Sequence, residues 1–436
     1  MSTGYNELLN CIKSGDLDTH FSALYPAANI TDQKNRYISL LTLLEKDQPY
    51  GQPIFINAPG RTELGGNHTD HNHGCVLAAA VDRDCVAAVT PIEDDEIILH
   101  SENFPFPICV DLDDLNPHTE EYGTPQGLIR GVAAGINKRG LPVKGFCGRL
   151  HSTCQPGTGL SSSAAFSLFI GAALTSQHNS FTLSSMELAI IAQEAENIFF
   201  GKPCGLMDQV ACSVGKTVFI DFCNPEQPNV EIIDYSIKQN GHCLIVINTG
   251  GDHTDLTSEY ASIPQEMQDA AKALGQPHGR AVTKNDFMTN ISTIRSKAGD
   301  RAALRLLHFI EENERAQSMA GNLRTGAFSD YLQNAADSGK SSCQLLQNCS
   351  TQTSSKNQGI LLALAISERI SANTVCRVHG GGFAGTVQAY VPENDFNNYR
   401  LSMEKIFGKG SVIPLHIGRP GVCSLHKEGL NVPERG

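Results

Sequence analysis

Residues 155–165 combine residue types that could bind phosphate. Gly157 and Gly159 carry no Cβ atom, so the backbone could approach a ligand closely there. Serines occupy positions 161–163, and the small apolar residues that follow favour a helix. The first amide groups of a helix have no internal partner and point toward an anion placed at its start. The segment therefore predicts a phosphate-binding loop and a protein that handles a nucleotide.

A second candidate segment, residues 58–74, is polar, rich in turn-forming residues and preceded by a short apolar run. A loop after a strand is a common place for a binding site. Arg61 could neutralise the charge of a phosphoryl group in transfer, and His68 and Asp70 could bind sugar hydroxyls. An ordinary solvated loop and a transition-metal site are the alternatives. The metal ligands would be His68, Asp70, His71 and His73.

Glu196 is a candidate ligand for a metal ion on a third segment. Residues 184–199 predict an amphipathic helix, with Ser184 and Glu187 forming a capping box at its start. At about 100° per residue, Glu196 lies beside the apolar stripe of this helix and Glu194 on the far side. Glu196 could therefore face an interior site and hold Mg²⁺ with a serine of the phosphate loop. The alternative is a charge on the helix surface.

Asp208 follows that helix in a mostly apolar run. A lone carboxylate in such surroundings is costly unless it is partnered or catalytic. It is therefore a candidate to accept the proton of a substrate hydroxyl. The alternative is a helix cap or a buried hydrogen-bonding group.

Two other patterns resemble nucleotide-binding motifs but lack a feature that the motif requires. Residues 338–341 and 215–217 look like the end of a P-loop, yet neither has the required glycine six positions before the lysine. Residues 380–385 match a dinucleotide fingerprint by letter. The residues that follow are β-branched and alternate, which predicts strand, glycine turn and strand rather than a Rossmann unit.

The elements that position these residues predict an α+β protein. Helices are expected before residue 50, at 126–138, after residue 164, at 184–199 and over much of 260–340. Strands are expected at 53–58, where the run ends at Pro59 and Gly60, and at 75–90, 96–100, 145–151, 217–221, 242–248, 376–378 and 386–391. Strands and helices do not alternate strictly. Residues 225–228, which begin and end with proline, are the predicted hinge between two halves.

The composition narrows the class of protein. The net charge of −13 argues against a nucleic-acid partner. We expect no secretory signal and no membrane segment. The 14 cysteines contain no Cys-x-x-Cys pair, which favours reduced thiols in a cytoplasmic protein.

Five segments together resemble the GHMP small-molecule kinases and, within them, the galactokinase family. Residues 59–74, 157–165 and 380–385 are similar to the three signatures of the superfamily. Residues 204–209 resemble the segment that holds the catalytic aspartate of the galactokinases, and residues 253–260 their sugar-contacting tyrosine segment. Order and spacing agree over nearly the whole chain.

This resemblance implies a GHMP kinase fold of two domains, residues 1–225 like ribosomal protein S5 domain 2 and residues 226–436 ferredoxin-like. Arg61 would stabilise the transferring phosphoryl group, and Asp208 would activate the sugar C1 hydroxyl. ATP would be held by Ser101, Gly157, Thr158, Gly159, Leu160, Ser161, Ser162 and Ser163. Mg²⁺ would be held by Ser163 and Glu196. The sugar would be held by Asn67, His68, Thr69, Asp70, Gly205 and Tyr260.

Three positions depart from the first signature of the family. Glu63 stands where the family has asparagine, Asn67 where it has glutamate, and His71 where it has tyrosine. In the family, the glutamate binds a sugar hydroxyl far from C1, and an amide there can donate as well as accept. The resemblance therefore implies a galactose 1-kinase. The alternatives are a kinase of N-acetylgalactosamine, galacturonate or arabinose, and a non-catalytic sugar sensor. The protein is expected to be a monomer or a weak homo-oligomer.

Overall fold

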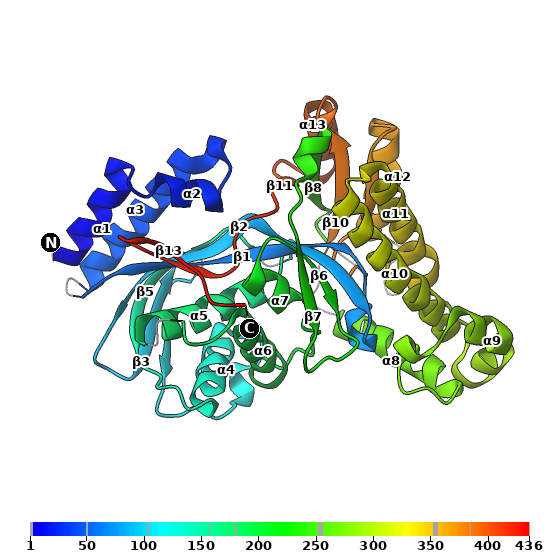
Figure 1. The fold of residues 1–436 in the computed structure, drawn as a ribbon, viewed down its shortest axis with the longest axis horizontal. Coiled ribbons are helices and arrows are strands. Elements are labelled where there is room, and N and C mark those ends of the chain that lie inside the picture. The colour runs from blue at the N-terminus through cyan, green and yellow to red at the C-terminus, as the bar shows by residue number, and fades with distance from the viewer. Residues whose placement is uncertain are drawn as a thin grey trace.

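The computed structural model describes residues 3–48, 51–102, 104–155, 157–178, 181–251, 256–351, 356–383 and 385–435. Within these ranges, the chain forms two β-sheets with helices packed around them (Figure 1). The mixture of separate helical and strand regions confirms the α+β class.

The larger sheet has the strand order β13-β12-β1-β2-β5-β3-β4, and β6 and β7 extend it from β2. Its strands are β1 (Ile54–Gly65), β2 (Cys75–Pro91), β3 (Glu96–Ser101), β4 (Ile108–Asp111), β5 (Phe146–Ser152), β6 (Thr217–Asp221), β7 (Asn229–Ile233), β12 (Cys423–His426) and β13 (Gly429–Asn431). The β3–β5 pair is parallel, and the other pairs are antiparallel.

The smaller sheet is antiparallel and has the order β11-β8-β10-β9. Its strands are β8 (His242–Asn248), β9 (Val375–Val378), β10 (Thr386–Pro392) and β11 (Val412–Leu415). The helices beside it are α8 (Thr257–Ala273), α9 (Lys284–Ala298), α10 (Asp300–Thr325), α11 (Phe328–Ser341), α12 (Gly359–Ile370) and α13 (Phe396–Phe407).

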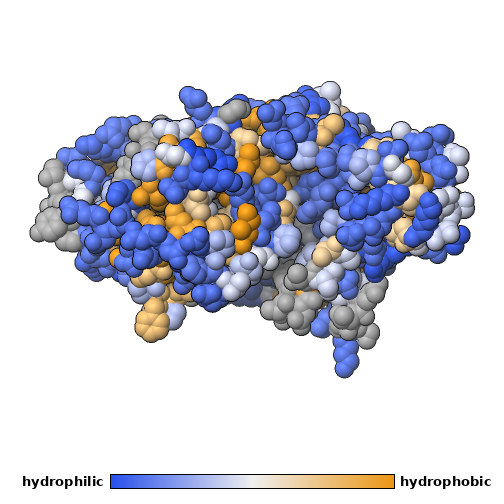
Figure 2. Space-filling view, turned by 90° about the horizontal axis from the view of Figure 1, so that it is seen from below, coloured by the Kyte–Doolittle hydropathy of each residue, from blue (hydrophilic) through white to orange (hydrophobic). Residues whose placement is uncertain are grey.

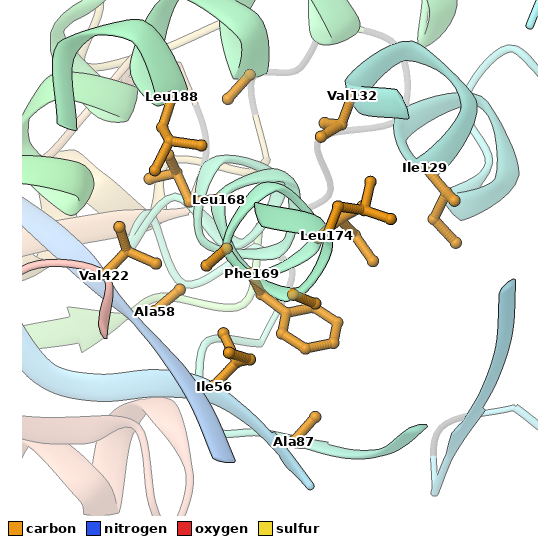
Figure 3. Packing of buried hydrophobic residues seen from close by; sticks show 14 of the residues in the cluster. Ile56, Ala58, Ala87, Ile129, Val132, Leu168, Phe169, Leu174, Leu188 and Val422 are labelled. Atoms are coloured by element: carbon orange, nitrogen blue, oxygen red, sulfur yellow. The ribbon is translucent and has the colours of Figure 1, made fainter. Parts of the chain in front are cut away.

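Helices cover both faces of the larger sheet. One layer consists of α1 (Thr3–Ser14), α2 (Asp18–Leu24) and α3 (Ile30–Asp47), and the other of α4 (Pro125–Lys138), α5 (Ser162–His178), α6 (Ser185–Glu194) and α7 (Met207–Val214). Because side chains alternate along a strand, Ile56 and Phe55 of β1 enter different cores. Figure 3 shows Phe169 of α5 packed toward Ile56 and Ala87 on one side. The tyrosines of the N-terminal helices pack on the other.

A third apolar core joins the two sheets. Leu64 and Leu77 of the larger sheet pack with Val246 and Tyr390 of the smaller one and with Met319 of α10. Seen from below, the surface over the C-terminal helices is mainly hydrophilic, whereas apolar side chains gather over the N-terminal half (Figure 2). Among the described helices, none combines the length and apolar composition that a bilayer crossing requires.

Three features differ from the sequence-based expectations. Strand β1 does not end at Pro59 and Gly60, because a shift in its pairing with β2 accommodates them inside the strand. The predicted hinge at residues 225–228 is wrong, since this segment joins the antiparallel strands β6 and β7. The predicted domain boundary at residue 225 is also crossed by strand pairing, because β7, β12 and β13 belong to the larger sheet.

Candidate active site

The phosphate loop connects β5 to α5, which begins at Ser162. Its glycines adopt left-handed backbone angles, with φ of 80° at Gly157 and 71° at Gly159. A Cβ atom at position 159 would lie 2.6 Å from Thr386 Oγ1. Two other residues of the loop fix its position. Thr158 Oγ1 donates to Gln155 O at 2.6 Å, and the side chain of Leu160 packs in the core between the sheets. The loop therefore needs glycine at position 159 for both its conformation and its packing.

Asp208 lies in the first turn of α7 and meets the phosphate loop and β1. Arg61 donates from Nε to Asp208 Oδ1 at 2.8 Å and from Nη2 to Asp208 Oδ2 at 2.9 Å. Ser161 Oγ donates to Asp208 Oδ2 at 2.5 Å. Burial raises the pKa of Asp208, but the arginine and the serine outweigh it, so the pKa lies below its ordinary value. The aspartate is therefore an oriented anion at neutral pH.

Glu196 is buried beside this group, in the π-helical turn η4 (Ala195–Phe199) that continues α6. The exposed fraction is 2% for Glu196, against 36% for the side chain of Glu194. This confirms which of the two faces inward. Gln209 Nε2 donates to Glu196 Oε1 at 3.0 Å, and Ser163 hydrogen-bonds to the same carboxylate. Burial raises the pKa of Glu196, Lys202 opposes this, and the net shift is upward.

The donor set of Ser163 and Glu196 fits a hard cation such as Mg²⁺, which prefers oxygen ligands and keeps several waters. The four-residue transition-metal site considered for His68, Asp70, His71 and His73 is not supported. The described part of the chain holds no group of three or more His, Cys, Asp or Glu side chains arranged to bind a metal.

Asp70 and Gly205, both predicted to hold a sugar, are brought together by the fold. Asp70 starts the short helix η2 (Asp70–Asn72), and its side chain is 8% exposed. Its Oδ1 accepts from His71 N at 3.0 Å. Its Oδ2 points so closely at Gly205 that a Cβ atom there would clash with it. Glycine at position 205 therefore leaves room for the carboxylate of Asp70.

His68 and Tyr260 both bind the glycine turn that joins β9 to β10. His68 Nε2 donates to Gly381 O at 3.0 Å, and Tyr260 Oη donates to Gly382 O at 3.0 Å. Burial lowers the pKa of His68 to about 3, and His71 adds to this effect, so the imidazole is neutral. Burial raises the pKa of Tyr260 to about 12. His68 also has a left-handed φ of 60°, an unfavourable conformation that clusters at functional sites.

Asn67 and Thr69 were expected to contact a sugar, but their side chains bind other parts of the protein. Both are fully buried. Thr69 Oγ1 donates to Gly66 O and Cys75 O, at 2.9 and 2.6 Å, and so closes the loop on itself. The amide of Asn67 is bonded entirely within the protein. Loop sequence alone does not reveal the partners Gly380, Ser342 and Asn348 of Asn67, because they come from distant segments.

Ser101 is the last residue of β3 and pairs with Leu150 of β5, the strand that leads into the phosphate loop. Because β3 and β5 are parallel, this pairing places Ser101 at the end of the sheet where the phosphate loop begins. His253, in the segment that resembles the sugar-contacting region, lies outside the described residues.

Glu312 and His308 of α10 were missed by sequence reasoning. Glu312 Oε1 accepts from Gly66 N at 3.0 Å and from Ser338 Oγ at 2.6 Å, and His308 Nε2 donates to Asn67 O at 3.0 Å. Burial raises the pKa of Glu312, but nearby cationic side chains and His308 lower it to about 2. Both residues belong to the apolar stripe of α10 at a spacing of four, which is the signal that could have identified them.

Two known protein families match the parts of the chain that contain residues 58–74, the phosphate loop and Asp208. The family described as galactokinase galactose-binding signature covers residues 47–91, and the GHMP kinases N terminal domain covers residues 127–216.

Curated relatives extend this similarity along the chain. A galactokinase of Thermotoga neapolitana is 30% identical over 362 residues, which is 81% of this chain and 93% of that protein. A galactokinase of Thermotoga petrophila is 33% identical over 277 residues, which is 63% of this chain and 73% of that protein.

Solved structures show the same fold. Galactokinase from Lactococcus lactis, complexed with galactose, superposes with a TM-score of 0.75 at 23% identity, over 88% of this chain and 99% of that one. Mevalonate kinase from Methanococcus jannaschii gives a TM-score of 0.60 at 15% identity, over 85% of this chain and 99% of that one. The fold is therefore that of the GHMP kinases, and the chain belongs to the galactokinase family of ATP-dependent sugar kinases.

Proposed function

We propose that this protein transfers the γ-phosphoryl group of ATP to the C1 hydroxyl of α-D-galactose. The observation that carries the proposal is the carboxylate of Asp208, which Arg61 and Ser161 hold beside the phosphate loop. A bound hydroxyl at this position would lie between a proton acceptor and a guanidinium group that neutralises phosphate charge. Positioning and charge neutralisation are the main contributions of proteins to phosphoryl transfer.

Residues 157–163 would hold the triphosphate, through backbone amides at the start of α5 and the serine hydroxyls. Ser101 would lie near the nucleotide. Ser163 and Glu196 would hold Mg²⁺, which when bound neutralises phosphate charge. Because the pKa of Asp208 is low, its anion would orient the sugar hydroxyl and take its proton late, as the oxygen–phosphorus bond forms.

The sugar would be bound by His68, Asp70, Gly205 and Tyr260. Asp70 and Gly205 lie in contact, and the ring of Tyr260 packs on Gly381. Galactose is the sugar named for the solved galactokinase of L. lactis. Kinases of N-acetylgalactosamine, galacturonate or arabinose remain alternatives, because Glu63, Asn67 and His71 depart from the family signature.

The sugar assignment is tested with a coupled ADP-release assay on galactose, N-acetylgalactosamine, galacturonate and arabinose. The proposal expects turnover to be highest on galactose. Turnover on another sugar alone would overturn the choice of galactose, and sugar binding without any ADP release would favour a sensor.

The role of Asp208 is tested with Asp208→Asn. Loss of the general base should lower kcat by about 10² to 10⁴. The matched control is Asp330→Asn, at an exposed carboxylate in the first turn of α11, which should leave kcat unchanged. Activity of Asp208→Asn within twofold of the wild type would refute the mechanism.

We also propose that the protein works in the cytoplasm, as a monomer or weak homo-oligomer without nucleic acid or membrane. All 14 cysteines are unpaired, as suits a reducing compartment. The net charge of −13 disfavours polyanionic partners. Light scattering after gel filtration would measure the oligomeric state.

A further inference from the structure

The side chain of Asn67 uses its whole hydrogen-bonding capacity inside the protein. Its Nδ2 donates to both carboxylate oxygens of Glu63, at 3.1 Å each, and to Gly380 O at 2.8 Å. Its Oδ1 accepts from Asn348 Nδ2 at 2.9 Å and from Ser342 Oγ at 3.3 Å. An amide offers two donor hydrogens and two acceptor lone pairs. No polar group of Asn67 is therefore left over for a ligand.

The charges around Asn67 explain why an amide suits this position. Glu63 is 2% exposed and pairs at 2.5 Å with Arg377, whose side chain is fully buried. A carboxylate at position 67 would lie against that of Glu63 and would face the carbonyl oxygen of Gly380 with no hydrogen to donate. The neutral amide donates to both acceptors. The negative charge of Glu63 therefore favours a neutral side chain with hydrogens to donate at position 67.

The glycine turn that Asn67 holds leads to the phosphate loop. Gly380 follows His379, and a Cβ atom at Gly159 would lie 2.8 Å from His379 Nδ1. The carbonyl of Gly159 accepts from Arg61 Nη1 at 2.5 Å. Contacts thus run from Asn67 through the glycine turn and the phosphate loop to the arginine that orients Asp208.

We infer that Asn67 is a positioning residue for phosphoryl transfer, which holds the glycine turn against the phosphate loop, and that it does not contact the sugar. The inference rests on the proposed function, because it concerns the same site. A misplacement of about 1 Å can lower a rate about a hundredfold. Loss of this link should therefore impair nucleotide binding and turnover more than sugar binding, because His68 and Tyr260 bind the turn through hydrogen bonds of their own.

The first test is Asn67→Ala. It should lower kcat between about tenfold and a hundredfold and raise the KM for ATP. The Kd for galactose, measured by calorimetry without nucleotide, should stay within about twofold of the wild-type value. A twofold change in Kd corresponds to only about 0.4 kcal/mol of binding free energy. The control Gln333→Ala, at an exposed position of α11, should change none of these values.

A charge exchange gives a second, independent test. Asn67→Asp should lower kcat more than Asn67→Ala, although aspartate is closer in size to asparagine. The double variant with Glu63→Gln should have a kcat about tenfold higher than Asn67→Asp alone, because the second change removes the repulsion between the two carboxylates. A defect unrelated to the charge at position 67 would not be rescued in this way.

Asn348→Ala removes the hydrogen bond that Asn348 donates to Asn67 Oδ1 and leaves the bonds of Asn67 to Glu63 in place. This variant replaces Asn67→Ala in the test if Asn67→Ala does not fold. It should show the same pattern of lower kcat and unchanged galactose affinity. A tenfold weaker Kd for galactose with unchanged kcat and KM for ATP would overturn the inference. If the wild type phosphorylates another sugar instead of galactose, the proposed function fails, and the same variants measured with that sugar decide the inference.

Discussion

At the scale of single residues, the environments of two carboxylates set them apart. Asp208 is held as an anion by Arg61 and Ser161, whereas burial raises the pKa of Glu196. Asp208 was singled out because a carboxylate in an apolar run needs a partner or a function, and Glu196 because it lies beside the apolar stripe of its helix. The partners of Asn67 were not predictable. Gly380 and Asn348 lie 313 and 281 positions away in the chain, and no local pattern encodes such contacts.

Glu196→Gln tests the proposed Mg²⁺ site. The amide keeps the size of the side chain but loses its charge, so the Mg²⁺ concentration for half-maximal rate should rise by at least about tenfold. A titration of the rate with Mg²⁺ at saturating ATP and galactose would measure this. Glu194→Gln is the matched control on the same helix, because its side chain faces the other way. An unchanged Mg²⁺ dependence in Glu196→Gln would refute the site.

At the scale of elements, local patterns predicted those helices and strands that carry their own signals. The capping box at Ser184 was found where expected, and β9 and β10 form the predicted strand, turn and strand over residues 375–392. The π-helical turn that carries Glu196 has no such signal. Nor does the return of β12 to pair with β1, because that pairing joins residues more than 360 positions apart.

The contact between η2 and the segment before α7 predicts the effect of Gly205→Ala. The new methyl group would displace Asp70, because its position overlaps Oδ2 of that carboxylate. Loss of a hydrogen bond to a charged group costs about 1.5–3 kcal/mol, so the KM for galactose should rise roughly 10- to 100-fold. The KM for ATP should change little.

Gly321→Ala is the control for this substitution. Position 321 lies within α10, and a Cβ atom there would meet no atom within 4 Å. Both KM values should stay at the wild-type level in this variant. Equal effects of the two substitutions, or a Gly205→Ala enzyme with unchanged galactose KM, would remove Asp70 from the sugar site.

At the scale of the whole molecule, one buried carboxylate ties the N-terminal helices to the larger sheet and to the segment before β12. Asp84 of β2 accepts from Tyr25 Oη at 2.6 Å and Asn57 Nδ2 at 2.7 Å. It also pairs with Arg36 of α3 at 2.8 Å and with Arg419 at 3.1 Å. Burial raises the pKa of Asp84, but the two arginines outweigh this effect and hold it well below its usual range.

Asp84→Asn should destabilise the protein by about 3–5 kcal/mol, because it leaves two buried guanidinium groups without a counter-charge. Urea unfolding at pH 7.5 measures the free energy of unfolding. Asp18→Asn is the control, since its ion pair with Lys34 belongs to the same helical layer but has an aspartate that is 51% exposed. That variant should lose less than about 1 kcal/mol. Equal losses would show that Asp84 is no anchor.

The buried histidines predict that acid weakens the folded state well before the carboxylates titrate. Burial lowers the pKa of His308 and His379 below their ordinary values, as it does for His68. The unfolded chain takes up protons at these sites as the pH falls through about 6.5, and the folded chain does so only at a lower pH. The unfolding free energy should therefore fall as the pH drops below 6.5, by up to about 1.4 kcal/mol per pH unit for each histidine.

Urea unfolding at pH 7.5 and pH 5.5 measures this difference. His308→Gln removes one of these groups and should make the difference smaller, because glutamine does not titrate. His118→Gln, at a surface histidine whose side chain is 30% exposed, should leave the difference unchanged. Equal stability of the wild type at the two pH values would mean that these histidines take up protons in the folded state. The buried surroundings of His308 and His379 would then tolerate a positive charge.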